Sequence, residues 1–212
     1  SFSEITLAHK LGMEVIVTDH HQLPSGFKPL CPTINPLRPD SLFPFKEFSG
    51  VGLAFYFAIA IRAILRESGF FQSDAEPDLK PYLDLVAIGT IADIVPLIEE
   101  NRILVKSGLD VLTKTQRPGI KALLKVSGIK NDQAITADDI AFKLAPRLNA
   151  MGRLGSATRA VHLLTTDDEA EGSSIATQMD SLNTQRQKIQ NGIVSECREK
   201  IDEMEGLERH RT

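Results

Sequence analysis

Cysteine is scarce in this chain: Cys31 and Cys197 are the two examples among 212 residues. They stand far apart and lack the close spacing of a metal knuckle, which argues against a cysteine-based metal site. A structural disulfide is not expected either, because such bonds are typical of exported proteins with a cysteine framework. We therefore interpret both residues as reduced thiols of a cytoplasmic protein.

Long apolar runs are also missing. No segment reaches the roughly 18 uninterrupted apolar residues that a membrane span needs, so the sequence predicts no membrane partner. The N-terminus, Ser1-Phe2-Ser3-Glu4, has no basic region followed by an apolar core, and nothing marks the chain for export. With 42% hydrophobic and 25% charged residues, the composition is that of a globular protein of one large domain or one and a half.

An overall excess of positive charge is absent, since the formal net charge is −4. This argues against a generally basic nucleic-acid-binding coat, but the charge is distributed unevenly. The segment from Ile140 to Thr166 contains no acidic residue, whereas Glu196 to Glu208 is strongly acidic. The basic residues of the first segment include Lys143, Arg147, Arg153 and Arg159. Such a segment suits local phosphate binding, with a solvated helix face as the alternative.

The tripeptide Asp19-His20-His21 directly follows the apolar run Val15-Ile16-Val17-Thr18, and Met13 to Thr18 is predicted to be a strand buried on both faces. Open α/β sheets bind ligands at the carboxyl ends of their strands, and imidazole and carboxylate are usual ligands of divalent metals. The tripeptide therefore indicates a metal or phosphate site. The alternative is an ordinary loop at the end of a strand.

The order of elements predicts an α/β fold. A helix ends at Lys10 before Gly12, and because a helix leading into a strand is half of a βαβ unit, we expect the chain to begin inside a domain. Prolines make the segment from Gln22 to Phe48 largely irregular, with one short strand near Pro32 to Asn35. Further helices are expected at residues 51–67 after a Ser49 cap, 101–112, 119–126, 138–144 after a Thr136 cap, and 157–164.

Asp93 lies within the apolar run from Tyr82 to Val95. A buried carboxylate costs several kcal/mol unless it is paired, hydrogen-bonded or bound to metal, so Asp93 is a candidate metal ligand. The alternative is that it caps or pairs locally. Asp84, near the start of the same run, needs no such role because a helix N-terminus favours negative charge.

Two later segments carry candidate phosphate-binding residues. In the first, Pro146 to Leu154, glycine allows close backbone approach and the flanking groups can bind a phosphodiester; they are Arg147, Asn149, Gly152 and Arg153. A turn with surface arginines is the alternative. From Glu169 onward, apolar residues at helical spacing up to Met204 predict one very long connecting helix. Its residues Asn183, Arg186 and Gln187 share a polar face, for which solvated surface is the alternative.

Taken together, these segments resemble successive blocks of the RecJ family, single-strand-specific 5′→3′ DNA exonucleases of the DHH phosphoesterase superfamily. The blocks run nearly from end to end. They are Thr18-Asp19-His20-His21, Ile34-Asn35-Pro36, Gly50-Val51-Gly52, Gly89-Thr90-Ile91-Ala92-Asp93-Ile94-Val95-Pro96-Leu97, Glu100-Asn101-Arg102, Arg147-Leu148-Asn149-Ala150-Met151-Gly152-Arg153-Leu154 and Asn183-Thr184-Gln185-Arg186-Gln187.

The resemblance implies a site with two Mn²⁺ or Mg²⁺ ions that activate water for attack on phosphorus. By position, His20 and Asp93 would bind metal, His21 would face the scissile phosphate, and Asp19 would orient the loop around the histidines. Arg153, with Arg147, Asn149 and Gly152, would hold DNA phosphate. The polar face with Asn183, Arg186 and Gln187 would line the path of the strand.

The resemblance also implies a domain organisation. Residues 1–168 would be the C-terminal part of a DHH-type parallel-sheet domain followed by a helical subregion, and residues 169–212 a long connecting helix. The family's upstream aspartate motifs, its DHHA1 domain and its OB domain would lie outside this chain. We therefore expect the isolated chain to be inactive. The implied partners are single-stranded DNA, a single-strand-binding protein and a helicase.

Two other hypotheses remain open. The first is another DHH phosphoesterase, such as an oligoribonuclease, a pyrophosphatase or a cyclic-dinucleotide phosphodiesterase; the blocks at 147–154 and 183–187 argue against it. The second is a RecJ-like scaffold for replication or repair that has lost its metals. The presence of His20, His21 and Asp93 argues against the scaffold.

Overall fold

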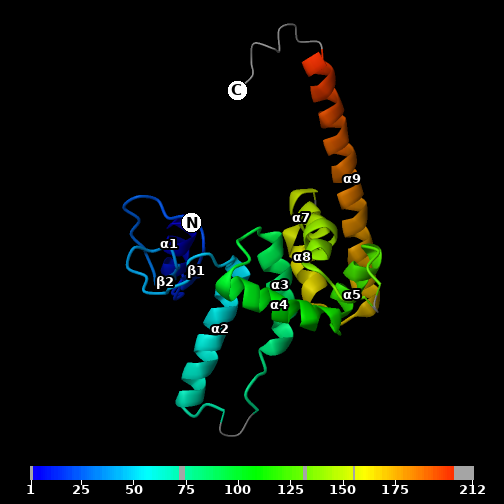
Figure 1. The fold of residues 1–212 in the computed structure, drawn as a ribbon. Coiled ribbons are helices and arrows are strands. Elements are labelled where there is room, and N and C mark those ends of the chain that lie inside the picture. Colours follow the sequence, from blue (N-terminus) through cyan, green and yellow to red (C-terminus); the bar gives the residue numbers. More distant parts are fainter. Residues whose placement is uncertain (1, 72–74, 131–132, 155, 203–212) are drawn as a thin grey trace. The chain divides into compact units, whose positions relative to one another are not determined.

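The computed structural model describes residues 2–71, 75–130, 133–154 and 156–202 (Figure 1). The chain divides into two compact units, and each is described by itself. The first comprises residues 1–115 and 133–141, and the second residues 116–132 and 142–212. This division does not test the predicted boundary after residue 168, which concerns the domains of a longer protein and stays a prediction.

The first unit opens with a helix and a small parallel sheet. Helix α1 (Phe2–Lys10) ends before Gly12, whose φ of +76° suits glycine. Strands β1 (Val17–Thr18) and β2 (Thr33–Ile34) pair in parallel, with Val17 opposite Thr33. The predicted short strand near Pro32 to Asn35 is confirmed. The α/β prediction holds in its coarse form, since the described chain is mostly helical with one two-stranded parallel sheet.

The prediction that Met13 to Thr18 form a strand buried on both faces is wrong. Strand β1 has two residues, and the side chains of Met13 and Ile16 are each 58% exposed. The physical reason is that few described residues pack against this strand. Within the described residues β1 pairs with β2 alone, and α1 has no buried residue to lay over the strand.

Three helices form the body of the first unit. Helix α2 (Gly50–Glu67) begins at Ser49, whose side chain accepts a hydrogen bond from the Gly52 N–H, as predicted. A short 3₁₀ turn, η1 (Lys80–Tyr82), leads into α3 (Leu83–Ala92), which packs between α2 and α4 (Glu99–Thr113). Their apolar core contains Phe45, Phe48, Leu53, Val86 and Leu104.

The chain belongs to the first unit again from Gln133 to Ala141, where Thr136 forms a capping box with Asp139 at the start of α6 (Ala137–Asp139). A π-helical turn, η2 (Ile140–Leu144), follows and leads into α7 (Ala145–Leu154). Pro146 explains the wider turn, because proline lacks an N–H and its ring clashes with the carbonyl four residues before it. Because α7 spans Ala145–Leu154, the segment from Pro146 to Leu154 is helical and not a turn.

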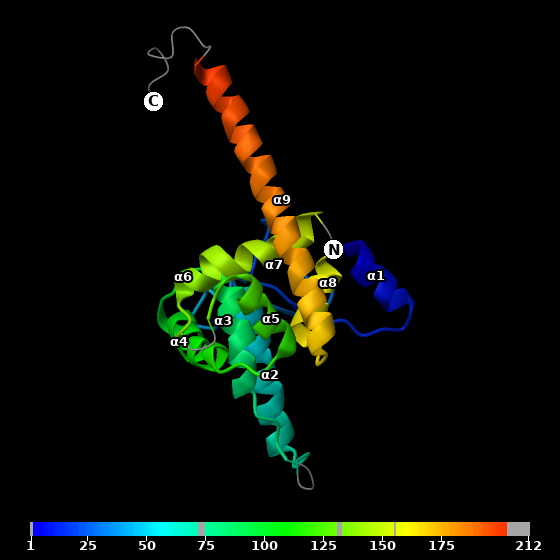
Figure 2. The ribbon, with the colours of Figure 1, turned by 90° about the vertical axis from the view of Figure 1, so that its right-hand side faces the viewer.

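The second unit is helical (Figure 2). It contains α5 (Pro118–Val126), α7, α8 (Ala157–Thr165) and α9 (Glu169–Asp202), with α9 packed on both α5 and α7. The helices predicted at 119–126 and 157–164 are confirmed. The fully buried side chains of this unit include Leu123, Leu144, Met151, Leu163, Ile175 and Met179.

The predicted long helix is confirmed as α9, which spans 34 residues. It begins at Asp168, whose side chain accepts a hydrogen bond from the Glu171 N–H. Its first half is buried at Ile175 and Met179, whereas every residue from Gln187 to Asp202 is exposed. Met204, the last position of the predicted apolar stripe, lies outside the described residues. None of the described helices has the length and apolarity to cross a membrane.

Candidate metal and phosphate site

The loop after β1 is organised by Asp19. Its carboxylate oxygen Oδ1 accepts hydrogen bonds from the backbone N–H groups of His20 (2.9 Å) and His21 (3.3 Å). The same oxygen lies 2.7 Å from Nδ1 of the His21 ring. Asp19 thereby holds both the turn of the backbone and the orientation of His21. This geometry suits the orienting role predicted for Asp19, with His21 as the ring that it orients.

This contact changes the acid–base properties of both groups. Burial raises the pKa of the Asp19 carboxyl, but the hydrogen bonds from the His21 ring and from the two backbone amides outweigh burial and leave that pKa lowered. The hydrogen bond and the negative charge of Asp19 raise the pKa of His21. His21 therefore stays protonated to a higher pH than an isolated histidine.

We predict that Asp19→Asn lowers the pKa of His21, because the neutral amide removes the negative charge that stabilises the imidazolium. NMR titration of the His21 ring in the metal-free protein measures this pKa. Asp40→Asn serves as the control, because Asp40 lies in the same unit but pairs with Arg38. An unchanged His21 titration in Asp19→Asn would show that the two side chains do not interact.

His20 and Asp93 are brought together from distant parts of the chain. Nε2 of His20 lies 3.5 Å from Oδ2 of Asp93. The His20 side chain is 18% exposed and lies against the start of α2, where a Cβ added to Gly50 would lie 3.5 Å from His20 Cδ2. An imidazole nitrogen and a carboxylate oxygen at this separation can bind one divalent ion together.

The prediction that Asp93 lies in the interior is wrong. Helix α3 ends at Ala92, and Asp93 is its C-cap residue with a side chain 40% exposed. Asp84 at the other end of the helix is the buried carboxylate, at 1% exposure. It accepts hydrogen bonds from the Leu85 N–H (2.7 Å) and the Thr115 hydroxyl (3.3 Å). Of the two aspartates in this apolar run, Asp84 is therefore buried, whereas Asp93 is partly exposed beside His20.

The donor set is incomplete within the described part of the chain. No group of three or more histidine, cysteine, aspartate or glutamate side chains comes together there in a way that could hold a metal. His20 and Asp93 thus supply two donors, fewer than a two-metal site requires. His21 is 77% exposed beside His20, with the ring centroids 4.4 Å apart, and is open to a ligand from solvent.

The predicted phosphate-binding residues of α7 differ in their surroundings. Arg147 is committed to other contacts, since Nε donates to Asp180 Oδ1 (2.9 Å) and Nη1 donates to the Lys143 carbonyl (2.7 Å). By contrast, Asn149, Gly152 and Arg153 are exposed and share one helix face by i, i+3 and i+4 spacing. A Cβ added to Gly152 would meet nothing within 4 Å, so this face is open.

The predicted polar face of α9 also divides. Asn183 is buried, at 3% exposure, and its Oδ1 accepts a hydrogen bond from Arg186 Nε at 3.2 Å. Arg186 in turn donates to Gln190 Oε1 at 3.0 Å, and Gln187 is exposed. Arg186 and Gln187 can therefore contact a ligand, whereas Asn183 orients Arg186.

Sequence reasoning assigned no role to two buried asparagines that hold the loops of the site. Asn35 donates from Nδ2 to the His21 carbonyl (3.0 Å), and its Oδ1 accepts from the Leu37 N–H (2.8 Å). Asn101 donates to two backbone carbonyls near Asp93 and α2. Both stand within the motif blocks that resemble the RecJ family, and this was the one signal that could have singled them out.

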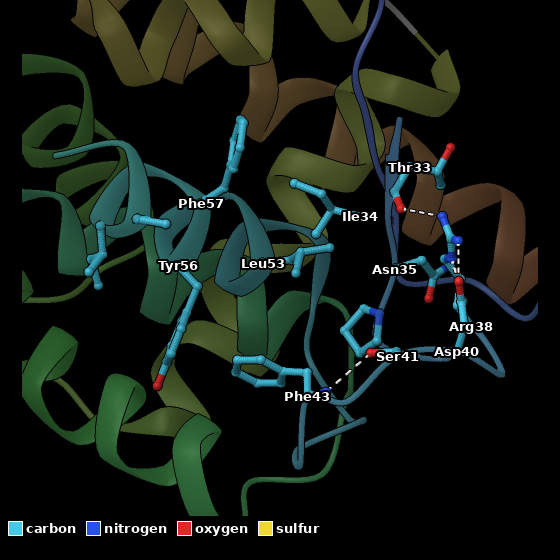
Figure 3. Close-up of a pocket in the computed structure, with 13 residues that line it drawn as sticks. Thr33, Ile34, Asn35, Arg38, Asp40, Ser41, Phe43, Leu53, Tyr56 and Phe57 are labelled. Carbon is cyan, nitrogen blue, oxygen red and sulfur yellow. Dashed lines mark hydrogen bonds and ion pairs between the residues drawn. The ribbon is translucent and has the colours of Figure 1, made fainter. Parts of the chain in front are cut away.

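A cavity of about 510 Å³ lies next to the loop after β1. None of the predicted metal-binding or phosphate-binding residues is among the residues that line it. Figure 3 shows Tyr56 and Phe57 of α2 on one side and the Arg38–Asp40 ion pair on the other. The lining is mostly apolar, and two of its residues also contact the loop after β1: the Ile34 carbonyl accepts from the Asp19 N–H (3.0 Å), and Asn35 donates to the His21 carbonyl.

The comparisons with known proteins concern the family to which the chain is similar. Residues 1–90 match the model of the DHH family, N-terminal domain. The matched residues include the Asp19-His20-His21 loop and the start of the run that ends at Asp93.

The similarity to one protein of this family extends over nearly the whole chain. The chain is 44% identical over 202 residues to the single-stranded-DNA-specific exonuclease RecJ of Dickeya dadantii. This alignment covers 93% of this chain and 35% of the relative. It is 43% identical over 215 residues to RecJ of Escherichia coli, covering 100% of this chain and 36% of the relative. The resemblance to the RecJ family is confirmed, and the chain spans about a third of the length of these curated relatives.

Solved structures show the same likeness. A crystal structure of exonuclease RecJ bound to manganese matches with a TM-score of 0.75 at 36% identity, covering 92% of this chain and 46% of the other. RecJ of Thermus thermophilus in complex with Mn²⁺ matches with a TM-score of 0.74 at 35% identity, covering 92% of this chain and 28% of the other. The same protein has also been solved in complex with Mg²⁺.

Proposed function

We propose that this chain is the central part of a metal-dependent exonuclease that degrades single-stranded DNA from the 5′ end in repair and recombination. The observation that carries the proposal is the 3.5 Å approach of His20 Nε2 to Asp93 Oδ2, in a chain similar to RecJ along nearly all its length. Fold alone would not support an activity, whereas a paired imidazole and carboxylate at the expected positions do.

His20 and Asp93 would hold Mn²⁺ or Mg²⁺, the ions named in the structures of the relatives. When bound, the metals supply an activated water and stabilise the leaving oxygen during phosphodiester hydrolysis. Because two donors do not complete such a site, the other ligands would come from the rest of a longer polypeptide. The division into a partial DHH domain at 1–168 and a connector at 169–212 belongs to this proposal.

His21 and Asp19 would act together on the scissile phosphate. His21 Nδ1–H would donate to the Asp19 carboxylate, and in the protonated ring Nε2–H would be free to donate to a phosphate oxygen. The backbone bonds from His20 and His21 to Asp19 keep the loop in one conformation. The ring would then be oriented before the substrate arrives.

The exposed face of α7 would hold a backbone phosphate. Arg153 is its cation, Asn149 can donate from its amide, and Gly152 leaves space for close approach. Arg147, bound to Asp180, would stabilise α7 against α9 and orient this face. Arg186 and Gln187, with Asn183 behind them, would line the path of the strand.

We predict that Arg153→Ala in the full-length polypeptide weakens the binding of single-stranded DNA by about 1–3 kcal/mol. This is the usual cost of losing a charge-assisted contact. The loss should not depend on sequence, because phosphates carry no base information. The slope of log affinity against log salt should fall by about 0.7, the value for one phosphate contact on a single strand. Fluorescence anisotropy with labelled oligonucleotides at several salt concentrations measures both effects.

Arg159→Ala is the matched control, since Arg159 is an exposed arginine on the neighbouring helix α8. It should change binding and the salt slope less. Equal effects of the two variants, or a parental slope for Arg153→Ala, would mean that this face of α7 is ordinary solvated surface.

The proposed function is tested with the full-length polypeptide that contains this chain. We expect release of nucleotides from single-stranded DNA labelled at the 5′ end, dependence on Mn²⁺ or Mg²⁺, and little action on blunt duplex DNA. The 212-residue chain alone should be inactive and bind Mn²⁺ weakly. Metal-dependent release from the 3′ end, or none from either end, would contradict the proposal.

Partners and location follow from the same proposal. The substrate would be single-stranded DNA, and a single-strand-binding protein and a helicase would expose it. The cysteines of the described chain, Cys31 and Cys197, are both free, which suits a cytoplasmic protein.

A further inference from the structure

Asn101 is fully buried in the first turn of α4, with an exposed fraction of 0%. Its amide nitrogen Nδ2 lies 2.6 Å from the Glu47 carbonyl oxygen and 2.9 Å from the Pro96 carbonyl oxygen. Two acceptors around one end of the side chain identify that end as the NH₂ group, which carries two donors. The other end, Oδ1, has no hydrogen-bond partner among the described residues. The side chain is therefore used for its two donors.

Both carbonyls belong to segments that carry the metal site. Pro96 lies three residues after Asp93, in the turn that leaves α3. Glu47 lies two residues before Ser49, which caps α2, and the next residue, Gly50, lies against the His20 ring. Asn101 thus joins the segment that positions the carboxylate to the segment that packs on the imidazole.

The turn after Asp93 requires such a restraint. Ile94 has a φ of +61°, a left-handed conformation that is costly for a β-branched residue. Its side chain is 89% exposed, so burial of the side chain does not hold it there. The turn is held by its backbone instead, by the bond from Ile94 N–H to the Ile91 carbonyl (3.1 Å) at its start and by Asn101 at Pro96.

We propose that Asn101 is a positioning residue of the metal site. Its two hydrogen bonds keep the turn after Asp93 and the start of α2 in register, and they thereby keep Asp93 Oδ2 and His20 Nε2 close enough to share an ion. Asn101 contacts neither metal nor substrate and acts through Asp93 and Gly50. The inference rests on the proposed function, because that function assigns His20 and Asp93 as ligands of a shared metal ion.

The test uses Asn101→Asp in the full-length polypeptide. The aspartate side chain is the same size but faces two carbonyl oxygens without a donor. We expect a 10- to 100-fold loss of Mn²⁺ affinity by calorimetry, about the loss seen for residues that orient metal ligands. The kcat for single-stranded DNA should fall by a similar factor at fixed Mn²⁺, with KM for DNA nearly unchanged, and excess Mn²⁺ should restore part of the rate.

Thr113→Ala is the matched control on the same helix. The Thr113 hydroxyl also makes two backbone contacts, to the Leu109 carbonyl (2.9 Å) and from the Ile135 N–H (3.2 Å), but neither leads to His20 or Asp93. It should lower stability without changing Mn²⁺ affinity. If Asn101→Asp does not fold, Asn101→Ala carries the same expectation without a buried charge.

The outcomes separate this inference from the proposed function. A parental Mn²⁺ affinity in a folded Asn101 variant, or an equal loss of affinity in Thr113→Ala, overturns the positioning role while the nuclease activity stands. A full-length parent that binds Mn²⁺ but does not cleave DNA overturns the proposed function. The Mn²⁺ affinities of the Asn101 variants then still test the positioning role of Asn101. A parent that binds no Mn²⁺ overturns both.

Discussion

His20→Ala and Asp93→Ala should each lower metal-dependent hydrolysis of single-stranded DNA by about 1,000-fold or more in the full-length polypeptide. A metal ligand supports several kcal/mol of transition-state stabilisation, and each 1.4 kcal/mol is about a factor of ten in rate. The fold should survive both changes, because Asp93 is 40% exposed and His20 lies at the edge of the core. Initial rates on 5′-labelled single strands, with circular dichroism as the folding check, measure the effect.

The control for this prediction is His162→Ala. His162 also pairs with a carboxylate, at 2.7 Å from Glu171, but this pair lies in the second unit and has no predicted role at the metal site. Its removal should leave the rate within a few-fold of the parent. Near-parental turnover of either His20→Ala or Asp93→Ala would refute the assignment of that residue as a ligand.

Gly89→Ala should lower the free energy of unfolding by disturbing the packing of α3 against α2. A Cβ at Gly89 would lie 2.6 Å from Cγ1 of Val51, a contact that real side chains do not make. Valine is stiff about χ1, so the clash must be relieved by moving α3 away from α2. Overpacking of this kind costs about 1–3 kcal/mol, which chemical denaturation would measure.

The same movement should reach the site, because α2 begins at Gly50 beside His20 and α3 ends at Asp93. We therefore expect Mn²⁺ affinity to fall in the folded Gly89→Ala protein. Gly192→Ala is the control, since Gly192 is also helical but a Cβ there meets nothing within 4 Å. Alanine at an open helix position should stabilise by up to about 1 kcal/mol. A stable Gly89→Ala protein with parental affinity would contradict the packing argument.

Most helices could be predicted from the sequence because their signals are local. Ser49 caps α2 through its own side chain, Thr136 forms its capping box with a residue three positions away, and Pro118 opens α5. The length of α9 follows from apolar spacing and a capped start at Asp168. The motif blocks also identified the correct family and, in His20 and Asp93, two side chains that do meet.

Burial was predicted poorly because it depends on what packs against a segment. The apolar run before Asp19 suggested a buried strand, yet β1 has one neighbouring strand in the described chain and is partly exposed. Asp93 was expected inside and Asp84 at an ordinary helix start, but the structure buries Asp84 and exposes Asp93. Periodicity is weak in an almost wholly apolar helix, so it does not tell which end of α3 is covered.

The family, the positions of most helices and the candidate histidine and aspartate groups could all be read from the amino-acid sequence. The folded chain was needed to learn which of these groups come together and which are already paired. It joined Asp93 to His20, committed Arg147 to Asp180, left Arg153 exposed, and placed Asn101 between two carbonyls. The reason is physical. Caps, turns and periodicity act between neighbours along the chain, whereas ion pairs and buried hydrogen bonds depend on the packing of helices that are far apart in sequence.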